Sequence, residues 1–143
     1  MRLSSRQARR LCASCLSLTL IAMLAGATAL ARDIAKEFPF DQELMLDTKP
    51  MRGSKRVPML EIARDGAVLI DLWCNSVQGH IVVVEDNITV LTGPKTNRTC
   101  PPERARGDEE GLSSLMQVTN WRREGDAVVL IGPQTLRFRK ATN

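Results

Sequence analysis

Residues 59–74 read MLEIARDGAVLIDLWC and contain two short apolar runs separated by a tight turn. The first run is Met59 to Ala63, and Arg64-Asp65-Gly66 is a hairpin signal. Within the second run, Ala67 to Cys74, one side of the chain carries Val68, Ile70, Leu72 and Cys74. A period of two residues is that of a β-strand with one face packed in the core. These residues therefore predict a β-hairpin with Cys74 pointing inward.

The alternation of short apolar runs and turn residues continues on both sides of this hairpin. We expect further strands at residues 43–47, 80–84, 88–91, 121–123, 127–131 and 135–139. Strands joined in order by hairpins favour an antiparallel sheet. The predicted fold is therefore mainly β (α+β): a small antiparallel sheet that curls into a barrel or partial barrel with one short helix.

The helix is expected after a long connection, residues 92–106, which contains three prolines. Asp108 is expected to cap its N-terminus, and Glu109 and Glu110 follow where the helix dipole favours negative charge. The predicted apolar face has helical spacing and consists of Leu112, Leu115, Met116 and Thr119. We expect about three turns.

Residues 1–31 have the three parts of an export signal. Four arginines precede an apolar stretch from Cys15 to Leu24, and Ala29-Leu30-Ala31 supplies an A-x-A cleavage pattern. We predict cleavage before Arg32, a periplasmic location and no stable membrane span in the mature protein. The alternative is an uncleaved anchor, because the apolar region from Leu11 to Ala31 approaches the ~20 residues that a spanning helix needs.

Cleavage changes the size and the charge of the chain. Removing residues 1–31 from the 143 leaves 112, which is enough for one compact domain and too few for two ordinary ones. The leader carries four arginines and no acid, so sixteen basic and sixteen acidic residues remain and the formal net charge becomes zero. We therefore expect no nucleic-acid partner, because the whole excess of basic over acidic residues lies in the leader.

Residues 32–58 are expected to form a lead-in, the first strand and a basic loop, and residues 59–143 the domain core. Phe38 and Phe40 in the lead-in are expected to cover one end of the core. The loop carries four cations: Lys49, Arg52, Lys55 and Arg56. They are the candidate contact for an anionic envelope polymer, a lipid head group or a partner protein. The alternative is a solvated turn, since charge clusters on loops are common.

The mature chain keeps two cysteines, Cys74 and Cys100. A single pair in an exported domain indicates one disulfide, and the alternative is two separate buried thiols. His80 is the lone histidine, whereas metal sites need several converging ligands. Neither H-E-x-x-H nor G-x-S-x-G occurs in the sequence. We therefore predict no catalytic residue, no metal and no cofactor, and we assign Trp73 and Trp121 to the core.

Three segments in register resemble the META domain family of HslJ-like heat-shock and envelope proteins. The first is Cys74-Asn75 followed by Gly79, similar to the family's G-C-N-x-x-x-G segment. The second is Thr96 to Pro101, similar to its T-x-x-x-C segment. The third runs from Glu110 through Trp121 to Phe138, similar to its helix and closing hairpin.

The resemblance implies a compact, mainly β domain of the cell envelope, without a known reaction, associated in some relatives with stress tolerance or secretion. It marks four structural motif positions, Asn75, Gly79, Thr96 and Trp121, and its two cysteine positions are similar to Cys74 and Cys100. Asn75 is expected to hydrogen-bond its own turn rather than a substrate. The chain departs from the family's pattern at Trp73, Val77 and Arg98.

The predicted function is that of a non-catalytic periplasmic envelope protein, not an enzyme, that acts in stress tolerance or envelope integrity through protein contacts. Its expected partner is an envelope protein or an anionic envelope component. The alternative is a small-ligand or anionic-polymer binding domain that uses the barrel mouth or the basic loop.

Overall fold

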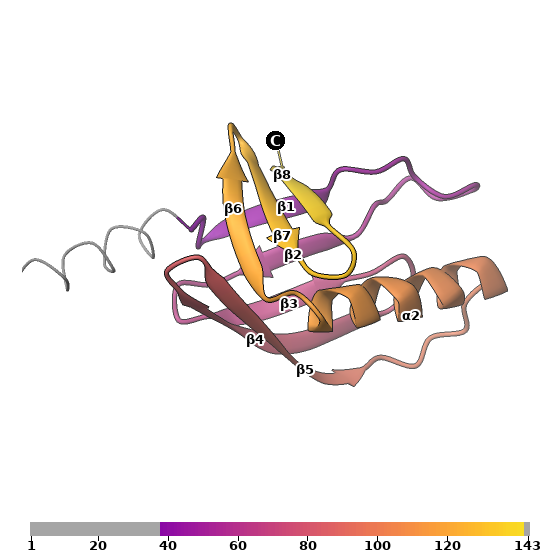
Figure 1. Cartoon of the computed structure of the whole chain (residues 1–143). Helices are drawn as coiled ribbons and strands as arrows, with labels where there is room; N and C mark the ends of the chain where they lie inside the picture. The colour runs from indigo at the N-terminus through magenta and orange to yellow at the C-terminus, as the bar shows by residue number, and fades with distance from the viewer. Residues whose placement is uncertain (1–37, 142–143) are drawn as a thin grey trace, which may run out of the picture.

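The computed structural model describes residues 38–141, which form a closed barrel of eight strands with one helix (Figure 1). The strands are β1 (Gln42–Leu46), β2 (Met59–Ile62), β3 (Ala67–Asp71), β4 (Ser76–Val84), β5 (Asn87–Lys95), β6 (Asn120–Glu124), β7 (Ala127–Ile131) and β8 (Leu136–Lys140). Each strand pairs antiparallel with the next, and β1 pairs with β8 to close the barrel. The helix α2 (Pro102–Met116) lies between β5 and β6 in the sequence. The mainly β fold expected from the sequence is confirmed.

The barrel interior is filled by the inward side chains of alternate strand residues. The largest fully buried apolar side chains of this interior are Phe138, Leu44, Leu60, Ile62, Ile70, Ile88, Leu130 and Val77. Filling by side chains is the usual state of an eight-stranded barrel. Leu44 comes from β1, so residues ahead of position 59 belong to the same barrel core.

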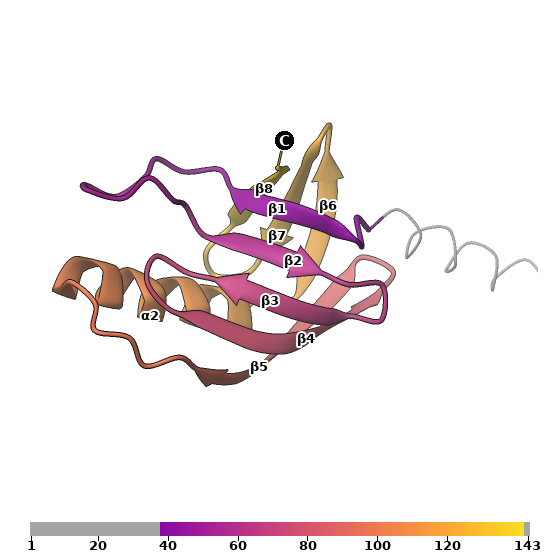
Figure 2. The same ribbon diagram turned by 180° about the vertical axis from the view of Figure 1, so that it is seen from behind.

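β5 and β6 meet at one end only, and α2 covers the opening between them. The ladder between the two strands consists of one residue pair, Asn87 with Asn120. Beyond that pair the strands diverge, and α2 lies across the opening (Figures 1 and 2). Leu115 of α2 and Val118 just after it are buried in the core. The helix therefore shields the part of the core that β5 and β6 leave uncovered.

The helix begins well before the residue predicted to cap it. Asp108 lies inside α2, whereas Pro101 occupies the N-cap position and Pro102 starts the first turn. The fixed φ of proline suits this turn, where its missing N–H has no helical partner. The predicted apolar face is wrong at two positions, since Met116 is 56% exposed and Thr119 lies past the end of the helix.

β4 and β5 are longer than the sequence predicts. Their register shifts between Val77 and Gly79, and the pairing then continues to Lys95. Pro94 lies in β5 at this irregularity, between the paired residues Thr92 and Lys95, in keeping with the confinement of strand prolines to edges and bulges. The long loop expected from Thr92 onward is therefore partly strand.

β3 is shorter than predicted. The strand ends at Asp71, and the N–H of Leu72 donates to the carbonyl of Asn75 at 2.8 Å, which turns the chain. Cys74 consequently lies in this turn and not on the inward face of a strand.

Phe38 packs over one end of the core and is 3% exposed. Its ring packs edge-on against the ring of Trp121, with the two ring centroids 4.9 Å apart. The ring centroid of Phe40 also lies 4.9 Å from that of Phe38. The expectation that the lead-in covers one end of the core is confirmed for the residues from 38 onward. The predicted export signal, residues 1–31, lies outside the described residues. Within residues 38–141, no helix has the length and apolar character needed to cross a membrane.

An ion-pair ladder covers the outer face of β7. Val129 is 2% exposed although it faces outward, and its register partners on the two neighbouring strands are Arg122 and Arg137. Glu124 forms ion pairs with both arginines, and Arg137 also reaches Asp47 at 3.4 Å. The arginine stems therefore shield a valine that a small barrel would otherwise leave exposed.

Candidate functional site

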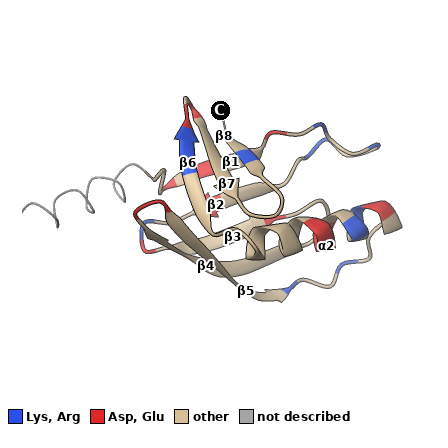
Figure 3. Ribbon diagram, viewed as in Figure 1, with Lys and Arg blue, Asp and Glu red and all other residues tan. Residues whose placement is uncertain are grey.

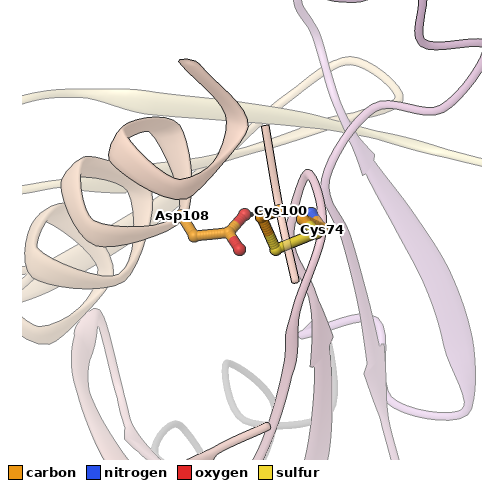
Figure 4. A group of neighbouring side chains, drawn as sticks. All are labelled: Cys74, Cys100 and Asp108. Carbon is orange, nitrogen blue, oxygen red and sulfur yellow. Dashed lines mark hydrogen bonds between the residues drawn. A yellow bond between two sulfur atoms is a disulfide. The ribbon is translucent and has the colours of Figure 1, made fainter. Parts of the chain in front are cut away.

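Cys74 and Cys100 form a disulfide, as predicted, with Sγ atoms 2.04 Å apart and Cα atoms 6.0 Å apart. The bond joins the turn after β3 to the segment that leads into α2. Figure 4 shows Asp108 of α2 pointing toward this pair of cysteines. The three residues come from three parts of the chain that only the folded barrel brings together.

Asp108 has no exposed surface and is held by backbone groups of the disulfide turn. Its Oδ1 accepts the N–H of Cys74 at 3.0 Å, and its Oδ2 accepts the N–H of Asn75 at 2.9 Å. The side-chain amide of Asn75 donates to the same Oδ2 at 3.0 Å. Three donors therefore offset the cost of burying this carboxylate.

Asn75 bonds across the chain as well as beside its own turn. Its Oδ1 accepts the hydroxyl of Thr96 and the N–H of Arg98, both at 2.9 Å. Its Nδ2 also lies 3.1 Å from the Sγ of Cys100. This 6% exposed side chain thus ties the start of β4 to the segment after β5 and to α2. Asn75 and Thr96 act structurally here.

The cluster of Cys74, Cys100 and Asp108 also has the composition of a metal site, with one ligand atom from each residue within 4.8 Å of the others. Both sulfurs are bonded to each other, however, and metal ligation requires thiolates. In this oxidation state the cluster joins three chain segments, and residues 38–141 contain no other group of this kind.

Gly79 and Trp121 also have structural positions. A Cβ at Gly79 would lie 2.3 Å from the carbonyl oxygen of Leu91, so only glycine fits between β4 and β5 there. Trp121 is 4% exposed, and its indole N–H donates to the carbonyl of Glu85 at 2.8 Å. The prediction that Trp121 belongs to the core is confirmed. His80 lies exposed on β4 and belongs to no ligand cluster among the described residues.

The basic loop between β1 and β2 rests on α2. Nη2 of Arg104 donates to the carbonyl of Gly53 at 2.7 Å. Near this contact, a Cβ at Gly107 would lie 2.4 Å from Cε of Met51 and 2.7 Å from Cδ1 of Trp73. The loop is therefore seated on the helix, because the absence of a side chain at Gly107 lets Met51 of the loop pack close to the helix backbone. Trp73 packs at the same place and is only half-buried.

Because the basic loop rests on α2, positively charged side chains from both lie together at one end of the molecule. The predicted cations Lys49, Arg52, Lys55 and Arg56 are all exposed, and none forms an ion pair with another described residue. Arg104 adds a fifth cation from α2 beside the loop. Figure 3 shows Lys and Arg on the loop and on the nearby part of α2. We call these five residues the basic end.

Sequence reasoning missed the part of this arrangement that α2 supplies. Arg104 fell in the connection expected over residues 92–106, and Gly107 lay just ahead of the expected N-cap Asp108, so nothing in the sequence indicated their contact with residues 51–53. A glycine inside a helix usually marks close packing, and this signal becomes visible once the helix is known to begin at Pro102.

The model of the META domain family matches residues 40–143. No curated protein matches the chain. Two NMR structures are similar in fold. One has 16% sequence identity and a TM-score of 0.56, covering 69% of this chain and 88% of that chain. The other, of a protein from Burkholderia xenovorans, has 14% identity and a TM-score of 0.60, covering 80% of this chain and 88% of that chain.

Proposed function

Because this chain belongs to the META domain family, we propose that it is a non-catalytic protein of the cell envelope that reaches the periplasm by a cleavable signal. In this proposal it supports stress tolerance or envelope integrity through contacts with other envelope proteins. The observation that carries the proposal is the Cys74–Cys100 disulfide. Disulfides form and persist in oxidising compartments such as the periplasm and are rare in the cytosol.

Contacts with proteins are supported by apolar side chains on the outside of the barrel. Val82, Val84 and Leu91 are 43%, 60% and 56% exposed on neighbouring strands. Exposed apolar groups that adjoin one another commonly mark interaction surfaces. Side chains fill the interior of the barrel, which supports recognition through this outer surface.

The export half of the proposal is tested by mass spectrometry of the protein recovered from its native cells. We expect an N-terminus at Arg32 and no free thiol at Cys74 or Cys100. An N-terminus at Met1, or two free thiols, would contradict export through a cleaved signal.

The contact half is tested by photo-crosslinking in the same cells. A photoreactive residue at Val84 is expected to capture a specific envelope protein during envelope stress, whereas one at Gly125, in the exposed β6–β7 turn, serves as the matched control. Equal capture at both positions would count against a specific contact.

The basic end supports a second candidate, binding of an anionic envelope polymer or lipid head group. Its four loop cations are exposed and form no ion pair with another described residue, and the half-buried Arg104 holds the loop beside α2 through its bond to Gly53. Saturable, salt-sensitive binding of an anionic glycan or of acidic vesicles by the purified protein would favour this candidate.

A further inference from the structure

Trp73 is the only aromatic side chain of the described residues that lies outside the barrel core. It is half-buried, and it belongs neither to the core cluster nor to the side chains packed against that cluster. The prediction that Trp73 fills the core is therefore wrong, because β3 ends at Asp71 and Trp73 falls in the turn that follows. Its indole N–H donates no hydrogen bond to another described residue, whereas that of Trp121 donates to Glu85. The Trp73 donor is therefore available to a ligand or to water.

Three segments of the chain meet at the turn that carries Trp73. A Cβ at Gly107 of α2 would lie 2.7 Å from Cδ1 of the indole and 2.4 Å from Cε of Met51 in the basic loop. The segment between β5 and α2 contacts the same turn, because the N–H of Arg98 donates to Oδ1 of Asn75 at 2.9 Å. The disulfide joins that segment to the turn covalently. The fold therefore fixes the indole among the loop, the helix and the segment that precedes the helix.

These segments carry far more positive than negative charge. Residues 48–58 and 96–108 contain the five cations of the basic end and two more, Arg98 and Arg106. Both added arginines are exposed and form no ion pair with another described residue. The same stretches contain two acids, of which Asp108 is buried and hydrogen-bonded through both oxygens, so only Glu103 is exposed. The half-buried indole therefore lies among seven cations and one exposed acid.

We propose that this end of the molecule binds an acidic glycan. The apolar face of one sugar ring packs against the indole of Trp73, and the acidic groups of the neighbouring sugars contact the surrounding arginines and lysines. The inference rests on the second candidate function given above for the basic end. It adds Trp73, Arg98 and Arg106 to that site and selects one class of anionic ligand.

The indole and the cations together select this ligand. Lysines and arginines alone attract any polyanion, and salt screens them. An indole provides a large apolar contact area, and Trp and Arg are among the residue types most enriched at binding hot spots. An acidic glycan presents apolar ring faces and negative charges along one chain, so it complements both features of the surface.

A lipid surface complements the same end less well. Peripheral binding to a bilayer draws on exposed apolar side chains as well as on cations. The exposed large apolar side chains of the described residues are Met45, Val82, Val84, Leu91 and Met116, and none lies in residues 48–58, 72–75 or 96–108. Single-stranded nucleic acid also stacks on indoles, but the disulfide is typical of compartments outside the cytosol. These observations therefore favour the glycan.

NMR of the unsubstituted protein, purified with its disulfide intact, tests the contact without any variant. The chain has two tryptophans and gives two indole N–H signals. Titration with an oligomer of uronic acid is expected to shift the signal of Trp73 and to leave that of Trp121, which is bonded to Glu85, in place. A neutral oligosaccharide of the same length is the control and should shift neither signal. Binding of the uronic acid oligomer without movement of the Trp73 signal would overturn the proposal.

Calorimetric titration of variants measures what the indole and the added cations contribute. Trp73→Leu should raise the dissociation constant for the uronic acid oligomer about tenfold, whereas Trp73→Phe, which keeps an aromatic ring, should raise it less. Neither variant should change the affinity for inorganic polyphosphate, which has no sugar ring. Arg98→Gln should weaken binding of both anions. Lys140→Gln makes the same change of charge at an exposed lysine on β8 and should leave both affinities unchanged.

Failure to bind any anion would refute the basic end as an anion site, and the glycan with it. Equal affinity for polyphosphate, with no effect of Trp73→Leu on either ligand, would leave anion binding intact and overturn the assignment of the glycan. Tighter binding of acidic vesicles or of single-stranded DNA, dependent on Trp73, would overturn the assignment in favour of that ligand.

Discussion

The carboxylate of Asp108 accepts the backbone N–H of Cys74 at 3.0 Å, although 34 positions separate the two residues. This bond and the two from Asn75 join α2 to the turn that also carries the disulfide. The helix is thus fixed to the barrel by polar contacts near its N-terminal half and by Leu115 near its end.

Asp108→Asn should destabilise the protein by about 1–3 kcal/mol, because the new amide places a donor against N–H donors in a buried site. Urea unfolding measures the loss. Asp126→Asn, in the exposed turn after β6, makes the same chemical change and should alter stability little. Equal unfolding midpoints for the two variants would show that the buried network contributes nothing.

The double substitution Cys74→Ser, Cys100→Ser should cost roughly 3–4 kcal/mol, since the bond closes a loop of about 27 residues in the unfolded chain. Thermal unfolding with and without reductant measures this: the variant and the reduced wild type should unfold together, below the oxidised protein. A variant as stable as the oxidised protein would rule out this contribution.

Two helix glycines should respond in opposite directions to alanine. Gly107→Ala should destabilise by about 1–3 kcal/mol, because its Cβ meets Met51 and the rigid ring of Trp73. Gly111→Ala should stabilise by up to about 1 kcal/mol, since its nearest neighbour, Leu72, lies at 3.8 Å and alanine favours a helix.

Urea unfolding gives the sign of each change, and limited trypsin cleavage in the basic loop reports whether Gly107→Ala lifts the loop from α2. Stabilisation by both alanines, with unchanged cleavage, would show that the loop is not seated as described.

Changing Lys49, Arg52, Lys55 and Arg56 together to Ser should abolish most of any binding to anionic vesicles and leave the barrel folded. The charge-preserving exchange of each Lys for Arg and each Arg for Lys is the control, and it should retain binding. Binding should also weaken with salt, because screening acts over about 8–10 Å near physiological ionic strength. Undiminished binding by the serine variant would place recognition elsewhere.

The hydrogen bond from Arg122 lowers the pKa of Glu124 below its ordinary value of 4.5; desolvation opposes this shift, and the hydrogen bond from Arg137 adds to it. A lowered folded-state pKa contributes stability above the unfolded value, which is lost as pH falls through the folded value. The stability difference between wild type and Glu124→Gln should therefore shrink below about pH 4.5 and in high salt. Unfolding curves at several pH values that keep a constant difference would refute this.

Local sequence patterns predicted the strands, because the alternation of apolar and polar residues in a strand depends only on the residues of that strand. The alternation of Val68 and Ile70 is the pattern of a half-buried strand anywhere, and both side chains are buried. The pairing of Cys74 with Cys100 was also predictable, since the chain beyond the predicted cleavage site offers no other cysteine. Closure between β1 and β8 follows from curvature accumulated over the whole sheet, which no single segment encodes.

The role of Asp108 was not predictable from its neighbours. An aspartate ahead of Glu109 and Glu110 has the local pattern of a helix cap. Its actual partners, Cys74 and Asn75, arrive from a distant turn. The basic end was predictable only in part, for the same reason. The four loop cations lie in one segment of the sequence, whereas Arg104 joins them only through the packing of α2.

The pairing of β1 with β8 has a consequence for how the chain can be rearranged. Leu44 is in register with Lys140, and the N–H of Ala141 donates to the carbonyl of Glu43 at 2.9 Å, so the two ends of the barrel segment lie side by side. Chains whose ends meet at the surface commonly tolerate circular permutation. A short linker across these ends, with new termini opened at the exposed Gly125-Asp126 turn, should preserve the barrel and its disulfide while making β7 the first strand of the chain.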